Sequence, residues 1–340
     1  MPAPAITRTP QLFSGDLRPY PGIPADWSVE KSRVAALILR DIERFAPEML
    51  GPLCPAEDQE NFWEDASRLS AAWWATDGNL VAKPAGTHDR PWTSEEMSRR
   101  FGPVTQDEEG GHHAIDTQIN HPIVQQFGGR AMMLGSIGID DDTDIIQWLA
   151  TRHRDHGVAR GVVKVAAHKN GIWSIELDND PEVIRRRLLD AMDWTYIRLD
   201  GQRDALFVQD ELALEFEYRL FIIDGEVVSG AGCVEEFTPL DRQSNRPFDS
   251  RMRRIRGHLE QGEPSPVEDR PDIFHELLSF GSRVASAHSG TVVIDVAKNA
   301  ATGEPVVIEL NGISNSGLYA SDPWTVAERL LRARDRGYTL

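Results

Sequence analysis

Three pairs of short apolar runs, each pair joined by a brief turn, constrain the fold of this 340-residue chain more than any other feature. β-branched residues dominate these runs, as they do in buried strands. Two of the turns carry Asn-Gly or Asp-Gly, which is a strong short-range signal for a β-hairpin. We therefore expect hairpins at 161–177, 215–232 and 291–311.

Helical patterns separate the hairpins, so the expected fold class is α+β. Asp142–Asp144 can cap a helix, and Gly157 can end it after a last turn rich in cations. Ser28 can cap another helix, which should end near Pro47. Further helices are expected at about 56–75, 181–192, 271–287 and 323–335, a buried strand at 205–210 and a polar loop at 237–269.

The formal net charge of −18 limits the classes of partner. A chain this acidic gains nothing from counterion release, so no nucleic acid is expected, and anionic lipid surfaces would repel it. Two cysteines, Cys54 and Cys233, make neither a disulfide framework nor a closed zinc site. No segment resembles the apolar core of a signal peptide or a spanning helix, so we expect a soluble cytoplasmic protein.

Acidic and amide side chains gather on the last predicted hairpin. Glu309 and Asn311 are two residues apart and share a strand face, and the turn can bring Asp295 beside them. Such oxygen ligands suit Mg²⁺, which is often shared with substrate phosphates. The alternative is that Asp295 and Glu309 point to solvent on an edge strand. If the metal site is correct, Asp295→Ala and Glu309→Ala should abolish ADP formation and leave the fold intact.

Cations interrupt two other apolar strands. Lys164 lies in the run 161–167, Arg219 in the run 215–223, and Lys169 at the turn after the first of these. A charged side chain in such a strand loses solvation unless it meets an anion, so these residues are candidates for binding phosphate. The alternative is an internal ion pair, for example between Arg219 and Glu217 or one of the acidic cluster.

Taken in order, VVK, FVQD, EYRLFIIDGEVV, VVIDVA, VVIELN and SGLY resemble the ATP-grasp superfamily of carboxylate–amine ligases. The resemblance covers about 141–340, and is greatest to little-characterised ATP-grasp proteins of phages and bacteria. It implies two subdomains that hold a nucleotide between them: a lid at about 141–212 and a C-terminal subdomain at about 213–340. Residues 1–140 would then form an N-terminal domain that shapes the substrate pocket.

The resemblance also implies roles for individual residues. Lys164 matches the lysine that contacts the α- and β-phosphates, and Lys169 falls in the phosphate-covering turn of the lid. Glu217 matches the acid that binds the ribose hydroxyls, and Arg219 the arginine that meets phosphate or the acylphosphate. The backbone that reads the adenine edge matches Val208, Gln209 and Asp210; the magnesium ligands match Asp295, Glu309 and Asn311; the acceptor or γ-phosphate side matches Asn315, Ser316 and Gly317. An upstream lysine of the family pattern has no clear match, with Arg130 the nearest cation and Lys83 a poorer one.

These parts imply an ATP-dependent ligase. A substrate carboxylate attacks the γ-phosphate of ATP, and an amine then displaces phosphate from the acylphosphate. Mg²⁺ is the expected metal, Mn²⁺ is expected to substitute for it, and a homodimer is one expected assembly. Two alternatives remain open: a non-catalytic nucleotide-binding or scaffold protein, and a phosphotransferase that stops at a phosphorylated product.

Other motifs are weaker. His112, His113, Asp116 and His121 form a histidine-rich cluster, but their spacing fits no standard zinc pattern, so a structural or surface role is favoured. Glu235 and Glu236 could extend the metal cluster, which is the less favoured interpretation. No GxxxxGK[ST] motif occurs, which excludes a P-loop.

Overall fold

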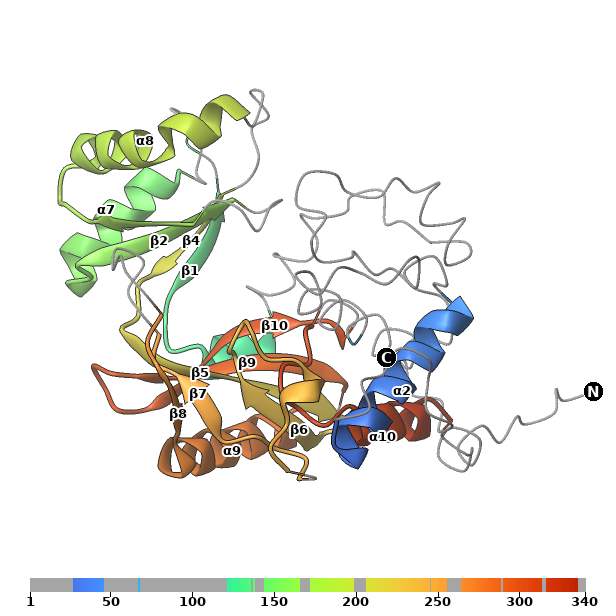
Figure 1. Ribbon diagram of the computed structural model, residues 1–340. Coiled ribbons are helices and arrows are strands. Elements are labelled where there is room, and N and C mark those ends of the chain that lie inside the picture. Colours follow the sequence, from blue (N-terminus) through green and yellow to red (C-terminus); the bar gives the residue numbers. More distant parts are fainter. Residues whose placement is uncertain are drawn as a thin grey trace, which may run out of the picture.

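Two antiparallel sheets of four strands each form the framework of the protein (Figure 1). The computed structural model describes residues 27–45, 67, 121–135, 137, 144–165, 172–198, 206–244, 246–255, 264–288, 290–313 and 316–335. Within these residues the three predicted hairpins are all present. No helix among them is both long and apolar enough to cross a membrane.

The first sheet, which we call the lid sheet, has helices on one face (Figure 1). Its strands are β1 (Met132–Gly135), β4 (Leu206–Asp210), β2 (Arg160–Val165) and β3 (Ile172–Glu176), in that spatial order. Helices α7 (Ile145–His156) and α8 (Pro181–Arg198) bury their apolar residues against it, among them Leu149 and Leu188. β1 precedes residue 141, the expected start of the lid, yet it pairs with β4 and belongs to this sheet.

The second sheet, the C-terminal sheet, is covered on both faces. Its order is β10 (Pro305–Asn311), β9 (Val292–Asn299), β5 (Leu214–Ile223) and β6 (Glu226–Gly232). Helix α9 (Pro271–Ser286) packs on one face, and the short helix α6 (Pro122–Phe127) joins the same core. Helices α10 (Pro323–Asp335) and α2 (Val29–Phe45) cover the other face.

Strand alternation in β5 explains how this sheet carries both a core and a charged site. Phe216, Tyr218, Leu220 and Ile222 point to the α9 face and are buried there. On the opposite face, Phe221 and Ile223 lie in the core under α10. Glu217 and Arg219 continue that same face beyond the helix. One end of the α10 face is therefore apolar, and the other end is charged.

The helix and turn signals in the sequence are largely confirmed. The Asp144 side chain accepts a hydrogen bond from the Ile146 amide at the start of α7, and Gly157 ends the helix with φ 68°. The β5–β6 turn places Asp224 at φ 55° and Gly225 at φ 74°, as an Asp-Gly hairpin requires. α8 runs to Arg198 rather than ending near residue 192. The prediction at 56–75 lies outside the described residues apart from position 67, which is helical.

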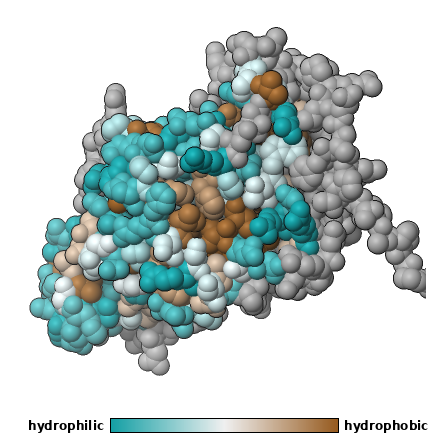
Figure 2. Space-filling model, turned by 90° about the horizontal axis from the view of Figure 1, so that it is seen from below, coloured by the Kyte–Doolittle hydropathy of each residue, from teal (hydrophilic) through white to brown (hydrophobic). Residues whose placement is uncertain are grey.

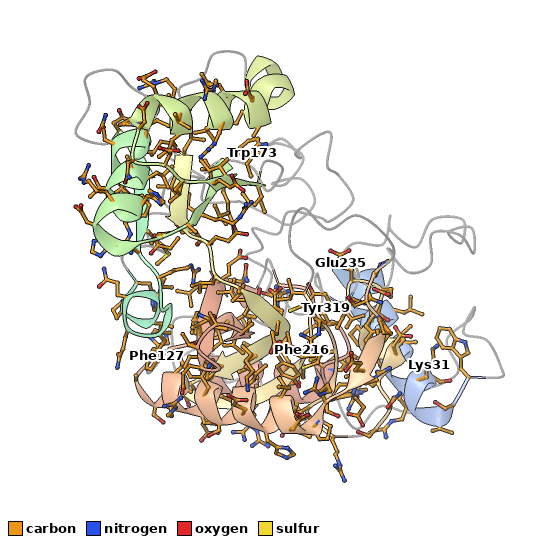
Figure 3. All side chains as sticks on the ribbon, turned by 90° about the vertical axis from the view of Figure 1, so that its left-hand side faces the viewer. Lys31, Phe127, Trp173, Phe216, Glu235 and Tyr319 are labelled. Carbon is orange, nitrogen blue, oxygen red and sulfur yellow. The ribbon has the colours of Figure 1, made fainter. Side chains whose placement is uncertain are left out.

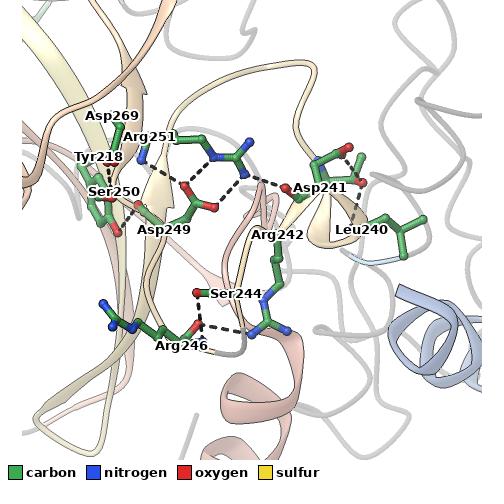
Figure 4. Close-up of polar contacts among 11 residues, drawn as sticks. Tyr218, Leu240, Asp241, Arg242, Ser244, Arg246, Asp249, Ser250, Arg251 and Asp269 are labelled. Carbon is green, nitrogen blue, oxygen red and sulfur yellow. Dashed lines mark hydrogen bonds and ion pairs between the residues drawn. The ribbon is translucent and has the colours of Figure 1, made fainter. Parts of the chain in front are cut away.

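The segment predicted as a polar loop at 237–269 has more structure than expected. It contains the 3₁₀ turn η3 (Pro239–Asp241) and a two-stranded ribbon of β7 (Arg251–Arg253) and β8 (Val267–Asp269). Figure 4 shows how its arginines order it: the Arg251 guanidinium donates to both Asp249 oxygens and to the Asp241 carbonyl. The many arginines in this segment therefore serve as internal cross-links.

The α9 side of the molecule carries apolar residues at its surface. Seen from below, a patch of apolar residues lies amid polar ones (Figure 2). Partly buried hydrophobic residues that pack against the α9 core include Phe248, Phe274 and Leu278. This face lies opposite the charged end of the sheet.

Candidate active site

An ion pair between neighbouring strands lies at the centre of the charged face. Arg219 of β5 stands directly across from Asp295 of β9. The Arg219 Nε and Nη2 atoms donate to the two Asp295 oxygens at 2.7 Å each. The Asp295 side chain is 2% exposed, so it does not point to solvent. The internal ion pair that the sequence left as an alternative is thus present, and it joins Arg219 to the acidic cluster.

Two further contacts hold the Arg219 guanidinium. Its Nη1 atom donates to the Gly317 carbonyl at 3.2 Å, and its Cζ atom lies 4.9 Å from the centroid of the Tyr319 ring. Figure 3 shows Tyr319 on the upper side of the C-terminal sheet, with Phe216 below it. Tyr319 has φ 46°, a conformation that costs free energy outside glycine and is often found at functional sites. The printed contacts leave two of the five guanidinium N–H groups of Arg219 for a ligand.

Glu309 and Asn311 of β10 complete the acidic cluster. Glu309 stands across from Asp295, and the Asn311 Nδ2 atom donates to Asp295 Oδ2 at 3.0 Å. Because a carboxylate can only accept, this bond fixes the orientation of the amide and leaves Asn311 Oδ1 to accept or to bind a cation. No hydrogen bond or ion pair joins the Glu309 carboxylate to the described residues.

The donor set fits Mg²⁺. Glu309 offers a carboxylate, Asn311 an amide oxygen, and Asp295 Oδ1 retains a lone pair beyond its bond to Arg219. These are hard oxygen ligands of the kind that Mg²⁺ prefers. Arg219 compensates most of the Asp295 charge, so Glu309 is the strongest cation ligand of the three.

Lys164 of β2 reaches this cluster from the lid sheet. It is partly buried, and it makes no hydrogen bond or ion pair with any described residue. Burial lowers the pKa of Lys164, and Arg130 adds to this, while the nearby Glu309 and Glu217 carboxylates oppose it. An ammonium group without a partner, facing carboxylates from another sheet, is suited to bind an anion between them.

Glu217 and Cys233 border the same cluster. The Glu217, Cys233 and Asp295 ligand atoms all lie within 4.8 Å of one another. Burial, with the Glu217 and Asp295 carboxylates next, raises the pKa of the Cys233 thiol well above its usual range. The sulfur therefore stays protonated at neutral pH and is a poor nucleophile, while the oxygen ligands remain the better match for a hard cation.

Glu217 gives the fold a measurable pH dependence. Burial, and then the Asp295 carboxylate, raises the pKa of Glu217 from 4.5 to about 8. Between these values the folded protein keeps a proton that the unfolded chain has released, so the free energy of unfolding falls as the pH rises. Without nucleotide or cation, Glu217→Gln should match the wild-type thermal midpoint near pH 5 and exceed it by at least about 2 °C near pH 9.

Scanning calorimetry from pH 5 to pH 9 checks this expectation. Glu215→Gln is the matched control, because Glu215 lies on the same strand and pairs with Arg254. Its difference from the wild type should not grow with pH. A constant difference between Glu217→Gln and the wild type would contradict the raised pKa.

The residues predicted to read adenine lie in the middle strand of the lid sheet. Val208 and Gln209 are flanked by β1 and β2, so their backbone groups are engaged on both edges. The Asp210 amide donates to the Ala131 carbonyl, and the Asp210 carboxylate pairs with Arg152 at 2.6 Å. The backbone that leaves the sheet begins after Asp210, at 211–213, which is a better position for contact with a base.

The other predicted residues are placed as follows. Ser316 is buried and its Oγ donates to the Gly312 carbonyl, so its hydroxyl serves the loop. Glu236 pairs with Arg253, and Glu235 is exposed, so neither carboxylate belongs to the cluster around Asp295. The His121 ring caps α6 by accepting from the Ile123 amide and packs against His288. The remaining predicted residues lie outside the described part of the chain: Lys83, His112, His113, Asp116, Lys169 and Asn315.

Sequence reasoning did not select Tyr319 or Cys233 as site residues. Tyr319 ends the SGLY motif, so its position beside the phosphate-side loop was a usable signal. Cys233 follows β6 and had none, because its approach to Glu217 depends on how β6 pairs with β5.

A match to a known family decides the identity of this arrangement. Residues 175–330 match a family model described as an ATP-grasp domain, the third family of its clade. The chain carries an ATP-grasp domain. The α+β architecture agrees with this fold. The search of curated proteins gives no match.

Solved structures with some similarity to this chain include three enzymes. One is the ATP-grasp ligase PsnB complexed with minimal precursor (14% identity, TM-score 0.37, covering 70% of this chain and 68% of that one). Another is the D-alanine-D-alanine ligase from Coxiella burnetii (10%, 0.37, 63% and 57%). The third is D-cycloserine synthetase DcsG (11%, 0.37, 63% and 66%).

Proposed function

We propose that this ATP-grasp domain is a magnesium-dependent ligase that joins a carboxylate to an amine-type nucleophile through an acylphosphate. One observation carries the proposal: unpartnered Lys164 on the lid sheet faces Glu309 and Asn311 on the C-terminal sheet. Lysine on one side and hard oxygen ligands on the other are what a magnesium–triphosphate group requires.

Each side chain then has a role in the proposed reaction. Lys164 binds the α- and β-phosphates, with Lys169 in the lid turn beside it. Backbone groups after Asp210 read the adenine edge, and Glu217 accepts from the ribose hydroxyls. Glu309, Asn311 and Asp295 hold Mg²⁺, which neutralises phosphate charge when bound.

Arg219 is the residue we propose to act on the transferred group. Its two remaining N–H groups can donate to the γ-phosphate and then to the acylphosphate, while Asp295 and Gly317 keep the guanidinium fixed. The substrate carboxylate forms a bond to γ-phosphorus and ADP leaves. The amine then forms a bond to the acyl carbon, and phosphate leaves with its bonding electron pair. The loop through Asn315, Ser316 and Gly317 would border the acceptor.

The N-terminal residues are proposed to complete the substrate pocket, with small-molecule or peptide carboxylates and amines as partners. A homodimer remains a prediction.

The alternative with an observation behind it is a non-catalytic nucleotide-binding protein. Arg219 engages both oxygens of Asp295, which reduces the charge that this carboxylate offers to a cation. A screen of ADP and phosphate release across mixtures of carboxylates and amines separates the functions. ADP release that requires both substrates supports the ligase. ATP binding without release in any mixture favours the non-catalytic protein, and a stable phosphorylated substrate favours a phosphotransferase.

A further inference from the structure

Strand β10 contains a bulge immediately before the acidic cluster. Val307 pairs with Val296 and Glu309 with the next residue of β9, Asp295, so Ile308 is an extra residue. Val307 lies in the α9 core, whereas Glu309 lies across from Asp295 on the charged face. Without a bulge, two residues this far apart would share one face of the sheet. The bulge is therefore what directs Glu309 to the site.

Arg130 binds both carbonyl groups of this bulge. Its Nη1 atom donates to the Val307 carbonyl at 2.8 Å, and its Nη2 atom donates to the Ile308 carbonyl. Its Nε atom donates to Gln209 Oε1 of the lid strand β4 at 2.8 Å. Burial lowers the pKa of Arg130 to about 10, which the Glu309 and Asp210 carboxylates oppose. A largely buried charge that costs this much solvation is held by its contacts to two sheets.

The backbone around Arg130 is fixed as well. Gly129 has φ 62°, and a Cβ atom there would lie 2.9 Å from Val306 Cγ1 of β10. The Ala131 amide donates to Asp210 Oδ2, and the Asp210 amide donates to the Ala131 carbonyl, both at 3.1 Å. The segment from Gly128 to Ala131 thus lies against β10 on one side and β4 on the other, where the chain passes from α6 to β1.

We propose that Arg130 is a positioning residue that locks the β10 bulge, so that Glu309 faces the nucleotide site, and ties this lock to the lid sheet through Gln209. This differs from the sequence-based expectation that Arg130 is the upstream phosphate-binding cation, because its guanidinium is occupied by protein oxygens. The consequence for cation binding rests on the proposed function of Glu309. The lock itself does not.

The consequence is tested by Mn²⁺ titration calorimetry with a non-hydrolysable ATP analogue bound. Arg130→Gln should weaken Mn²⁺ binding by at least about 10-fold, as removal of a group that orients a metal ligand does. The double variant with Glu309→Gln should bind no more weakly than Glu309→Gln alone, because Arg130 acts through Glu309. Arg187→Gln is the matched control: Arg187 also donates to two consecutive carbonyls, Glu176 and Leu177, but on the lid.

Hydrogen exchange of the amides at 307–310, without nucleotide or cation, tests the lock separately. Exchange should quicken in Arg130→Gln and stay unchanged in Arg187→Gln. Arg130→Lys keeps the charge but cannot bridge both carbonyls and Gln209, so it should show both effects more weakly, and it decides the matter if Arg130→Gln does not fold. Wild-type exchange and Mn²⁺ binding in Arg130→Lys, or additive losses with Glu309→Gln, would overturn the proposal. Faster exchange with normal Mn²⁺ binding in Glu309→Gln would instead retain the lock and reject the proposed role of Glu309.

Discussion

Glu309→Gln is expected to lower the rate of ADP formation by about 10²–10³-fold and to leave thermal unfolding close to that of the wild type. The Glu309 carboxylate makes no hydrogen bond or ion pair with the described residues, so its replacement breaks no contact that holds the fold. It is also the acidic ligand whose charge Arg219 does not compensate, because that arginine is bound to Asp295. The loss should therefore fall on the cation and the transferred phosphate.

Steady-state ADP release at saturating Mg²⁺, together with calorimetric unfolding, checks this result. Glu304→Gln is the control, because Glu304 is exposed in the turn that leads into β10. It removes the same charge from the same hairpin and should keep wild-type turnover. Equal turnover in Glu309→Gln and the wild type would reject Glu309 as a metal ligand.

Most of the fold follows from local sequence signals. Asp224-Gly225 and the cap residues Asp144 and Gly157 act within a few positions of themselves, and the structure has them as expected. β1 was harder to predict, because its residues become a strand only by pairing with β4, more than 70 positions later. The polar segment after β6 was also read as a loop, since the ion pairs that order it join residues whose spacing carries no periodic pattern.

The candidate site was predicted residue by residue but not contact by contact. Glu309 and Asn311 share a face because they are two positions apart. The bulge before them has no sequence signature: Val306, Val307 and Ile308 are all apolar, so any of them could face the core. Strict alternation would pair Ile308 with Leu310 on the α9 side, whereas the structure buries Val307 and Leu310 there.

The partner of Arg219 could not be chosen from sequence either. Glu217 is two residues away and shares its face, and local spacing favours it as much as any acid. The register between β5 and β9 decides the matter by placing Asp295 directly across from Arg219. The expectation that Asp295→Ala and Glu309→Ala behave alike therefore needs revision, because only Asp295 belongs to a buried ion pair.

Asp295→Asn should lose turnover and also lower the free energy of unfolding by about 3–5 kcal/mol, the usual cost of removing one partner from a buried ion pair. Arg219 is 11% exposed and Asp295 2%, so water cannot replace the missing charge around the guanidinium. Asparagine is close to aspartate in shape, so a packing defect would not account for the loss. Denaturant unfolding and ADP release, measured on the same preparation, give the two effects.

The double variant Arg219→Met/Asp295→Asn separates stability from catalysis. It removes the unpaired charge, so it should recover much of the free energy of unfolding lost in Asp295→Asn. Turnover should remain lost, because Arg219 is proposed to donate to the transferred phosphate. If Asp295→Asn unfolds like the wild type, the ion pair contributes little to the fold. If the double variant regains turnover as well as stability, Arg219 acts on Asp295 alone and has no part in phosphate transfer.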